Sequence, residues 1–130
     1  MVRVISMPAD GNCLFWALGW WYDTSGPALR NIIINFLSKN PDHTIQGAPF
    51  RDWIKWETDM EFNQYIIAMQ RGEWGGAVEM AIFNALTKSA VSVWEIRDQR
   101  LNRIAHIDGD DKPHCHIVYL NRNHYGVVAE

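Results

Sequence analysis

The 130 residues suffice for one domain, which we place at 1–130, and a chain of this length buries about two thirds of the surface that it exposes when unfolded. The composition, 48% hydrophobic and 21% charged, is that of an ordinary globular protein and excludes a disordered or fibrous chain. A net charge of −3 does not suit a phosphate-binding surface, and no apolar run reaches membrane-spanning length. We therefore predict no nucleic-acid partner, no membrane partner, and a cytoplasmic protein whose two cysteines are free thiols.

The first part of the chain is predicted to be mainly helical. A β-branched strand at 2–6 comes first, and apolar residues then recur at helical spacing in five segments. These helices are expected at 14–22, 28–37, 50–57, 60–71 and 77–86. The segment 42–49 is polar and broken by glycine and proline, which predicts an irregular connection there.

The last third of the chain changes to strand signals. Four short β-rich runs are expected at 91–96, 102–107, 115–120 and 124–129. The polar segments between them, at 97–100, 108–111 and 121–123, have the composition of hairpin loops. Helices followed by such strands indicate the α+β class, with a small, mainly antiparallel sheet of four to five strands packed between helices.

Cys13 stands directly after the turn-forming run Asp10-Gly11-Asn12 and directly before the predicted helix at 14–22. A helix N-terminus lowers the pKa of a thiol, because its unpaired N–H groups favour the thiolate, the nucleophilic form. The same turn can direct backbone N–H groups at an oxyanion beside the sulfur. The segment fits a nucleophilic cysteine, and equally a buried apolar cysteine behind a helix cap made by Asp10 or Asn12.

A catalytic thiol needs an imidazole close to the sulfur, and spacing alone does not choose among the histidines of this chain. They are His43, His106, His114, His116 and His124. His124 follows the turn at 121–123 and begins the last predicted strand, where a scaffold can present a side chain at a loop rim. His114 and His116 flank Cys115, which leaves a metal or redox site as an alternative. No CxxC or HxxxH spacing supplies further ligands, so we predict no metal.

Three separate segments resemble the signature blocks of the OTU (ovarian tumour) cysteine proteases. The first is Asp10-Gly11-Asn12-Cys13-Leu14-Phe15, the second is Trp74-Gly75-Gly76 with Glu79 shortly after it, and the third is the strand at 117–120 followed by Asn123-His124-Tyr125. Their order and separation agree with the family, and together they span nearly the whole chain. The resemblance implies a papain-like OTU fold, no metal or organic cofactor, and hydrolysis of the peptide or isopeptide bond after the C-terminal Gly-Gly of ubiquitin.

The resemblance also implies a role for each matching residue. Cys13 becomes the nucleophile and His124 the general base. The loop of Asp10, Gly11 and Asn12 is expected to bind the oxyanion, together with the N–H of Cys13. The substrate tail is expected to meet a wall formed by Trp74, Gly75, Gly76 and Tyr125.

Position 126 departs from the family pattern. Many OTU proteases carry Asp or Asn two residues after the catalytic histidine, where it orients the imidazole, but here that residue is Gly126. Asn123 is one candidate for the orienting group, although it should point to the opposite strand face, and Ser6 is a polar candidate ahead of the cysteine. The run 121–123 is equally explained as a hairpin turn, and the site can also work as a Cys–His dyad.

The resemblance predicts ubiquitin, polyubiquitin or a ubiquitin-like modifier as the partner. Since ubiquitin's C-terminal tail carries arginines, we expect nearby carboxylates to face it. The candidates are Glu57, Asp59, Glu61 and Glu73 near Trp74, and Asp108, Asp110 and Asp111 in a later loop. A non-catalytic ubiquitin-binding module and a polyprotein-processing viral cysteine protease remain alternative functions. The short chain also suggests an effector that acts in the cytosol of a host cell.

Overall fold

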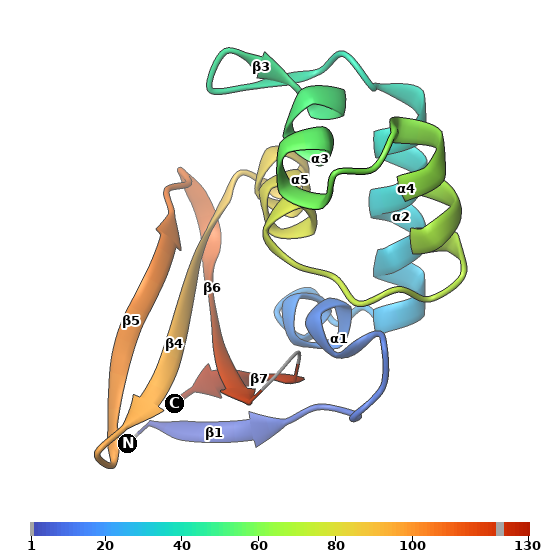
Figure 1. Cartoon of the computed structure of the whole chain (residues 1–130). Helices are drawn as coiled ribbons and strands as arrows, with labels where there is room; N and C mark the ends of the chain where they lie inside the picture. Colours follow the sequence, from blue (N-terminus) through green and yellow to red (C-terminus); the bar gives the residue numbers. More distant parts are fainter. Residues whose placement is uncertain (1, 122–123) are drawn as a thin grey trace.

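The chain folds into a five-stranded sheet accompanied by helices (Figure 1). The computed structural model describes residues 2–121 and 124–130. The strands of this sheet are β1 (Arg3–Ser6), β4 (Ser89–Arg97), β5 (Arg100–Ile107), β6 (Asp111–Asn121) and β7 (His124–Ala129). They lie in the order β1-β7-β6-β4-β5, and neighbouring strands are antiparallel except for the parallel pair β4 and β6. The predicted α+β class with a small, mainly antiparallel sheet is confirmed.

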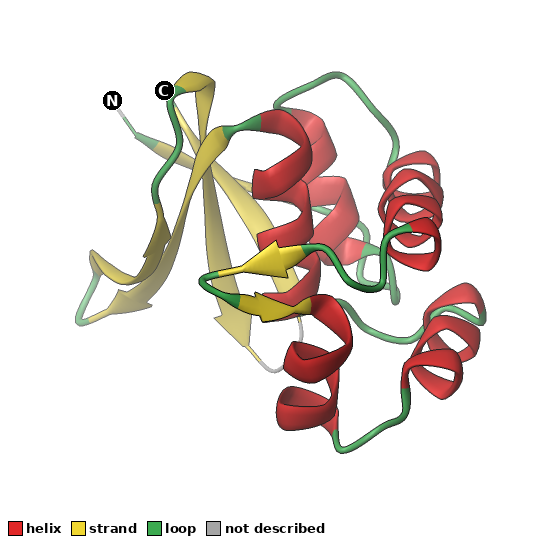
Figure 2. Ribbon diagram, turned by 90° about the horizontal axis from the view of Figure 1, so that it is seen from above, coloured by secondary structure: helices red, strands yellow, loops and turns green. Residues whose placement is uncertain are grey.

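The helices lie on one side of the sheet in both views, whereas the sequence analysis expected helices on both sides (Figures 1 and 2). They are α1 (Cys13–Trp20), α2 (Gly26–Lys39), α3 (Phe50–Thr58), α4 (Phe62–Gln70) and α5 (Ala77–Thr87). Alternate residues of a strand point to opposite faces of the sheet, so Val91 and Cys115 face the core while Ser92 and His114 lie on the other face. Polar groups on that second face are consistent with the arrangement of the described residues, in which the helices pack on the first face only.

Local sequence explains the bounds of α2. The Ser25 hydroxyl oxygen accepts the N–H of Ala28 at 3.2 Å, which caps the helix, and Pro27 lies in the first turn. The helix ends at Lys39, with Asn40 as the cap ahead of Pro41. The helix thus extends two residues beyond the predicted segment 28–37 at each end.

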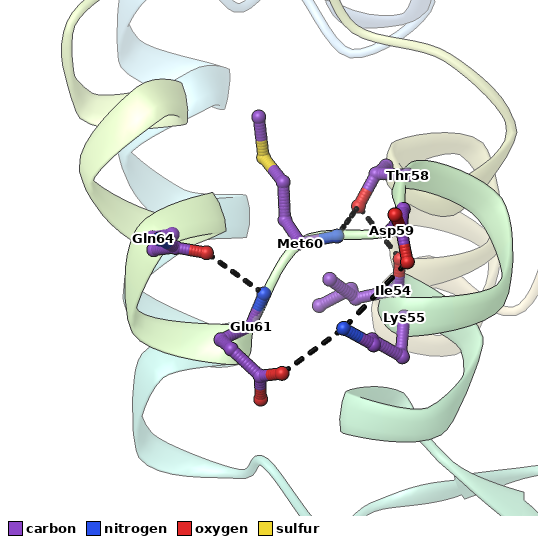
Figure 3. Close-up of polar contacts among 7 residues, drawn as sticks. All are labelled: Ile54, Lys55, Thr58, Asp59, Met60, Glu61 and Gln64. Atoms are coloured by element: carbon purple, nitrogen blue, oxygen red, sulfur yellow. Dashed lines mark hydrogen bonds and ion pairs between the residues drawn. The ribbon is translucent and has the colours of Figure 1, made fainter.

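The corner between α3 and α4 is held by a group of polar contacts (Figure 3). Lys55 Nζ lies 3.0 Å from Glu61 Oε1. The Thr58 hydroxyl donates to a carbonyl of α3 at 2.7 Å and accepts the N–H of Met60 at 3.2 Å. At the start of α4 the N–H of Glu61 donates to Gln64 Oε1 at 3.1 Å, as part of a capping box. The corner thereby fixes Thr58 and Met60, which line a cavity described below.

The connection from β5 to β6 is not a hairpin, which differs from the expectation for 108–111. β6 lies on the other side of β4 from β5 and runs parallel to β4, so the chain crosses the beginning of β4. A Cβ at Gly109 would lie 2.4 Å from the carbonyl oxygen of Lys88, so this close crossing requires a glycine. The turn between β4 and β5 is the expected hairpin, with φ of 52° at Asp98 and 64° at Gln99.

The segment 42–49 has more regular structure than the sequence indicates. It contains a small hairpin of β2 (Thr44–Ile45) and β3 (Ala48–Pro49), joined by Gln46 and Gly47, both with positive φ. Trp53 Nε1 donates to the carbonyl of Ile45 at 2.9 Å and ties the hairpin to α3. Two-residue strands are too short to produce a recognisable alternation of apolar and polar residues.

The core lies between the helices and the sheet. α1 packs against α2 and β7, with Phe15 and Leu18 on the helical side and Ile117 and Val127 on the sheet, and all four side chains are inaccessible to solvent. Within the described residues no helix is both long enough and apolar enough to cross a membrane.

Candidate active site

Cys13 is the first residue of α1, and its side chain is completely buried where the helix meets β7. The backbone N–H of Tyr125 hydrogen-bonds to the sulfur, as does that of Leu14. β1 pairs with β7 only from Gly126 onward, so Tyr125 lies just beyond the end of β1. The fold therefore joins residues 13 and 125, which are far apart in sequence, at the N-terminal end of α1.

His124 is the first residue of β7 and directly precedes Tyr125, so it adjoins the residue that hydrogen-bonds to Cys13. The side chain is partly buried, and its Nδ1 atom is buried without a hydrogen-bond partner among the described residues. The structure thus brings together the neighbourhoods of the predicted nucleophile and the predicted base. Asn123, the candidate orienting residue, lies outside the described residues.

The environment of Cys13 changes one expectation from the sequence. Burial raises the pKa of the Cys13 thiol, and the negative charge of Asp10 adds to this effect. The N–H groups of Tyr125 and Leu14 lower the pKa, as a helix N-terminus should, but burial outweighs them. The net shift is therefore upward rather than downward, because the sequence shows the helix start but not the depth at which it is buried.

The loop of Asp10, Gly11 and Asn12 forms a tight turn before α1. The N–H of Asn12 donates to Asp10 Oδ1 at 2.8 Å, and the N–H of Cys13 donates to the Asp10 carbonyl at 3.2 Å. Asn12 precedes α1, but its side chain does not cap the helix. Two of the N–H groups predicted to bind an oxyanion therefore already have partners within the turn.

Arg30 is a residue of this site that the sequence analysis missed. It lies on α2, only 6% of it is exposed, and its guanidinium binds the turn: Nη2 donates to the Gly11 carbonyl at 2.6 Å and Nε to Asn12 Oδ1 at 2.6 Å. Nη1 donates to the carbonyl of Met69 at 2.8 Å, and the guanidinium carbon lies 4.4 Å from the centre of the Phe15 ring. The available signal was a charged residue within an otherwise apolar helix face.

The segment Trp74-Gly75-Gly76 lies against the helix that carries Cys13. A Cβ at Gly75 would come within 2.9 Å of Leu14 Cδ2, so a larger residue there would displace the Leu14 side chain. Trp74 is 40% exposed and lines, with Gly75 and Gly76, a cavity of about 330 Å³. The structure therefore places the second sequence block beside the first.

Two of the predicted carboxylates line this cavity, namely Glu57 and Glu73, whereas Asp108, Asp110 and Asp111 do not. Asp59 and Glu61 lie within 4 Å of Lys55 at the corner between α3 and α4. The cavity also contains Glu79, a residue of the second block whose role the sequence left open.

Glu79 is almost completely buried at the start of α5. Its Oε1 accepts the N–H of Gly76 at 2.7 Å, whereas its Oε2 has no hydrogen-bond partner among the described residues. Burial raises the pKa of this carboxyl to about 7, against the lowering effects of the N–H of Gly76 and the charge of Arg30. Glu79 thus fixes the end of the glycine pair and titrates near neutral pH.

Tyr125, the remaining predicted substrate-contacting residue, is buried. Its ring lies 5.3 Å from that of Tyr119, and burial raises the pKa of its hydroxyl to about 12. In the structure it reaches the site through its backbone N–H, which hydrogen-bonds to Cys13.

The alternative site at Cys115 has a different geometry. Cys115 faces the helices and is completely buried, whereas His114 and His116 lie on the other face, where their rings stack 4.0 Å apart. Among the residues that the structure describes, no three His, Cys, Asp or Glu side chains form a group that could hold a metal ion. The strand alternation therefore separates the thiol from the two imidazoles.

No model of a known protein family matches the chain. The chain is 25% identical over 116 residues to the ubiquitin thioesterase OTU1 of Gallus gallus, and the match covers 82% of this chain and 34% of that protein. The chain thus spans about a third of the length of this curated relative.

Solved structures resemble the chain over nearly all of its length. The Hazara virus OTU bound to ubiquitin superposes with a TM-score of 0.73 at 21% identity, covering 98% of this chain and 80% of that one. The OTUD1 OTU domain gives 0.73 at 16% identity, covering 99% and 86%. An OTU deubiquitinase from Wolbachia pipientis wMel, bound to ubiquitin, gives 0.68 at 16% identity, covering 99% and 96%. The resemblance in the sequence is confirmed at the level of the fold, and the chain is a domain of the OTU fold.

Proposed function

We propose that this chain is a thiol-dependent deubiquitinase that hydrolyses the peptide or isopeptide bond after the C-terminal Gly-Gly of ubiquitin. The observation that carries the proposal is the hydrogen bond from the Tyr125 N–H to the Cys13 sulfur, because it brings the residue next to His124 to the thiol. The buried, unpartnered Nδ1 of His124 adds a proton acceptor on the same strand end. The ubiquitin bound in two of the similar solved structures supports the choice of substrate.

In the proposed reaction His124 removes the proton from the Cys13 thiol. A base is needed because burial raises the pKa of this thiol and therefore favours its protonated form. The thiolate attacks the carbonyl carbon of the terminal glycine of ubiquitin, which forms a C–S bond and moves one electron pair to the carbonyl oxygen. When the electron pair returns from the oxygen, the C–N bond breaks and the protonated His124 gives its proton to the leaving lysine amine, which leaves a thioester.

The resulting thioester is hydrolysed in a second half-reaction. Water, deprotonated by His124, attacks the thioester carbonyl, and the C–S bond breaks to release the ubiquitin carboxyl group, which ionises in solvent. His124 returns its proton to the sulfur and restores the thiol. Both half-reactions place negative charge on the carbonyl oxygen. We assign the stabilisation of this charge to the N–H groups of the Asp10-Gly11-Asn12 turn. Use of the Asn12 N–H requires that its bond to Asp10 Oδ1 be exchanged for one to the substrate.

The segment Trp74-Gly75-Gly76 indicates on which side of the site the substrate tail binds. We assign the ubiquitin tail to the side of α1 where Gly75 packs against Leu14, because backbones approach most closely at glycines. Among the described residues, the cavity beside it is lined by Glu57, Glu73 and Glu79 and by no basic residue, which suits a tail that contains arginines.

Hydrolysis of a fluorogenic ubiquitin C-terminal amide tests this proposal, with Cys13→Ala and Cys115→Ala as a matched pair. Cys13→Ala should have no turnover and should still bind ubiquitin, while Cys115→Ala should keep its activity. Ubiquitin with an electrophilic C-terminus should add its mass to Cys13 of the wild-type protein. Ubiquitin binding without turnover in the wild-type protein would instead support the non-catalytic module, and labelling at Cys115 would contradict the assignment of the nucleophile.

A further inference from the structure

Arg30 contacts the Asp10-Gly11-Asn12 turn from its buried side. The guanidinium donates to three acceptors, two of them in the turn, namely the Gly11 carbonyl and Asn12 Oδ1, and one at the end of α4, the Met69 carbonyl. It also stacks on Phe15 of α1. One side chain from α2 therefore links the turn, α1 and α4.

The bond to the Gly11 carbonyl has a consequence for the N–H on the other side of that peptide. A trans peptide is planar, and its C=O and N–H point in opposite directions. Arg30 Nη2 holds the Gly11 carbonyl toward the interior at 2.6 Å, so the N–H of Asn12 points away from Arg30. There it meets an anionic oxygen, Asp10 Oδ1, at 2.8 Å, which indicates that this N–H is oriented to bind a negatively charged oxygen.

The turn has little freedom to move away from Arg30. A Cβ at Gly11 would lie 2.5 Å from the Gly72 carbonyl oxygen, so the segment after α4 closes the side next to Gly11. Arg30 is held in turn by Phe15 and by the Met69 carbonyl. Burial lowers the pKa of the Arg30 guanidinium, and nearby carboxylates oppose this effect, Glu79 most strongly, followed by Asp10 and Glu73.

The chemistry of the side chain matters at this position. Only arginine carries several N–H donors in a rigid plane, whereas lysine carries a single ammonium group on a flexible stem. A lysine at position 30 keeps the charge but cannot bind Gly11, Asn12 and Met69 with the same geometry.

We infer that Arg30 is a positioning residue, which fixes the peptide between Gly11 and Asn12 so that the Asn12 N–H can stabilise the oxyanion of the proposed reaction. This inference rests on the proposed function. Arg30 acts through the turn and does not touch the substrate, because its donors are directed at Gly11, Asn12 and Met69.

The test compares two reactions of the same thiol in Arg30→Lys. Amide hydrolysis passes through an oxyanion, whereas alkylation of Cys13 by iodoacetamide occurs at a saturated carbon and forms none. We expect kcat for the fluorogenic ubiquitin amide to fall at least about tenfold, since loss of one oxyanion donor lowers kcat by about 10²–10³-fold. KM and the alkylation rate of Cys13 should each stay within about twofold of the wild-type values, because neither depends on the oxyanion.

Two further variants keep the result interpretable. Asn12→Ala removes one acceptor of Arg30 at a partly exposed position and should also lower kcat. It serves as the test if Arg30→Lys proves too unstable to assay. Arg51→Lys, at an exposed position on α3, is the matched control and should be unchanged.

The outcomes separate the inference from the proposed function. Wild-type kcat in both Arg30→Lys and Asn12→Ala would overturn the inference alone, as would an alkylation rate that falls in parallel with kcat, because the effect would then lie in the sulfur or the fold. No turnover by the wild-type protein would overturn the proposed function and this inference with it.

Discussion

The two cysteines have the same burial and very different surroundings. Both side chains are inaccessible to solvent. The Cys13 sulfur lies at the start of a helix and receives N–H groups from two segments, whereas the Cys115 thiol in the middle of β6 lies 3.7 Å from the Pro113 carbonyl oxygen, an acceptor. Burial raises the pKa of Cys115 to about 12, and at Cys13 the N–H groups oppose the same effect.

The difference shows what separates a candidate nucleophile from a structural cysteine. Burial disfavours the thiolate at both positions, so exposure does not distinguish them. Backbone donors and charged neighbours distinguish the two cysteines. Arg30 and Glu79 lie in the region of Cys13, while the polar groups beside Cys115 in sequence lie on the opposite face of the sheet.

The largest expected effect on kcat comes from replacing His124, the histidine in the region of Cys13, by alanine. His124→Ala should lower kcat by at least about 100-fold, since a general base contributes about 10²–10⁴-fold. His116→Ala, the matched change beside Cys115, should leave kcat unchanged, because its ring lies on the far face of the sheet. Steady-state hydrolysis of a ubiquitin amide measures both. Equal losses in the two variants would contradict the contrast between the regions.

The second prediction concerns stability in the Cys13 region. The pKa of Glu79 is about 7 in the folded chain and near its ordinary 4.5 in the unfolded chain, so between these values the folded state holds a proton that the unfolded state has released. Stability therefore falls as the pH rises from 4.5 to 7, by about 3 kcal/mol in total.

Glu79→Gln should remove this pH dependence and still accept the N–H of Gly76. Urea unfolding at pH 5 and at pH 8 measures the effect, with Glu73→Gln, an exposed carboxylate of the same cavity, as the control. If the wild-type protein and Glu79→Gln lose the same stability between the two pH values, the assignment to Glu79 is wrong.

The third prediction compares the two thiols directly. Iodoacetamide should modify Cys13 at least about tenfold faster than Cys115 in the folded chain, because the thiolate is the reactive form and only at Cys13 do backbone N–H groups oppose the rise in pKa that burial causes. Peptide mass spectrometry of samples quenched over time measures both rates, and the difference should vanish in denaturant. Faster modification of Cys115 in the folded chain would contradict the expectation that Cys13 is the more reactive thiol.

The smallest expected effect belongs to the region of Cys115. Burial lowers the pKa of His116, and neighbouring His114, His106 and Arg103 lower it further. The folded state therefore disfavours the protonated imidazole, and stability present above the ordinary pKa of histidine should be lost as the pH falls through the folded value. His116→Gln should weaken this acid sensitivity, as thermal unfolding between pH 5 and 7.5 would show; an unchanged profile would exclude His116 as its source.

Much of the fold could be predicted because its signals are local. The cap at Ser25, the glycine and proline near helix ends, and the strand alternation of the last third depend on residues within a few positions of one another. The crossing at Gly109 could not be predicted, since polar loop composition does not show whether the next strand pairs with the previous one. The hairpin at 44–49 was missed because its strands have two residues each.

The candidate site likewise contains residues that the sequence could predict and residues that it could not. Cys13, His124 and the Trp74-Gly75-Gly76 segment could be named from motifs, and the structure brings these segments into one region. Arg30 could not, because nothing near it in sequence shows that its guanidinium reaches the Gly11 carbonyl. The direction of the Cys13 pKa shift was also predicted wrongly, since desolvation depends on the packing of α1 under β7.

By itself the sequence determined where helices and strands begin, which residues follow the turn at Asp10-Gly11-Asn12, and which family the blocks resemble. Only the tertiary structure decided that Tyr125 hydrogen-bonds to Cys13, that Arg30 holds the turn, and that the two cysteines have different surroundings. The physical reason is that backbone propensities and capping act between neighbours in the chain. Burial, charge compensation and hydrogen bonds across a hundred residues exist only once the chain has folded.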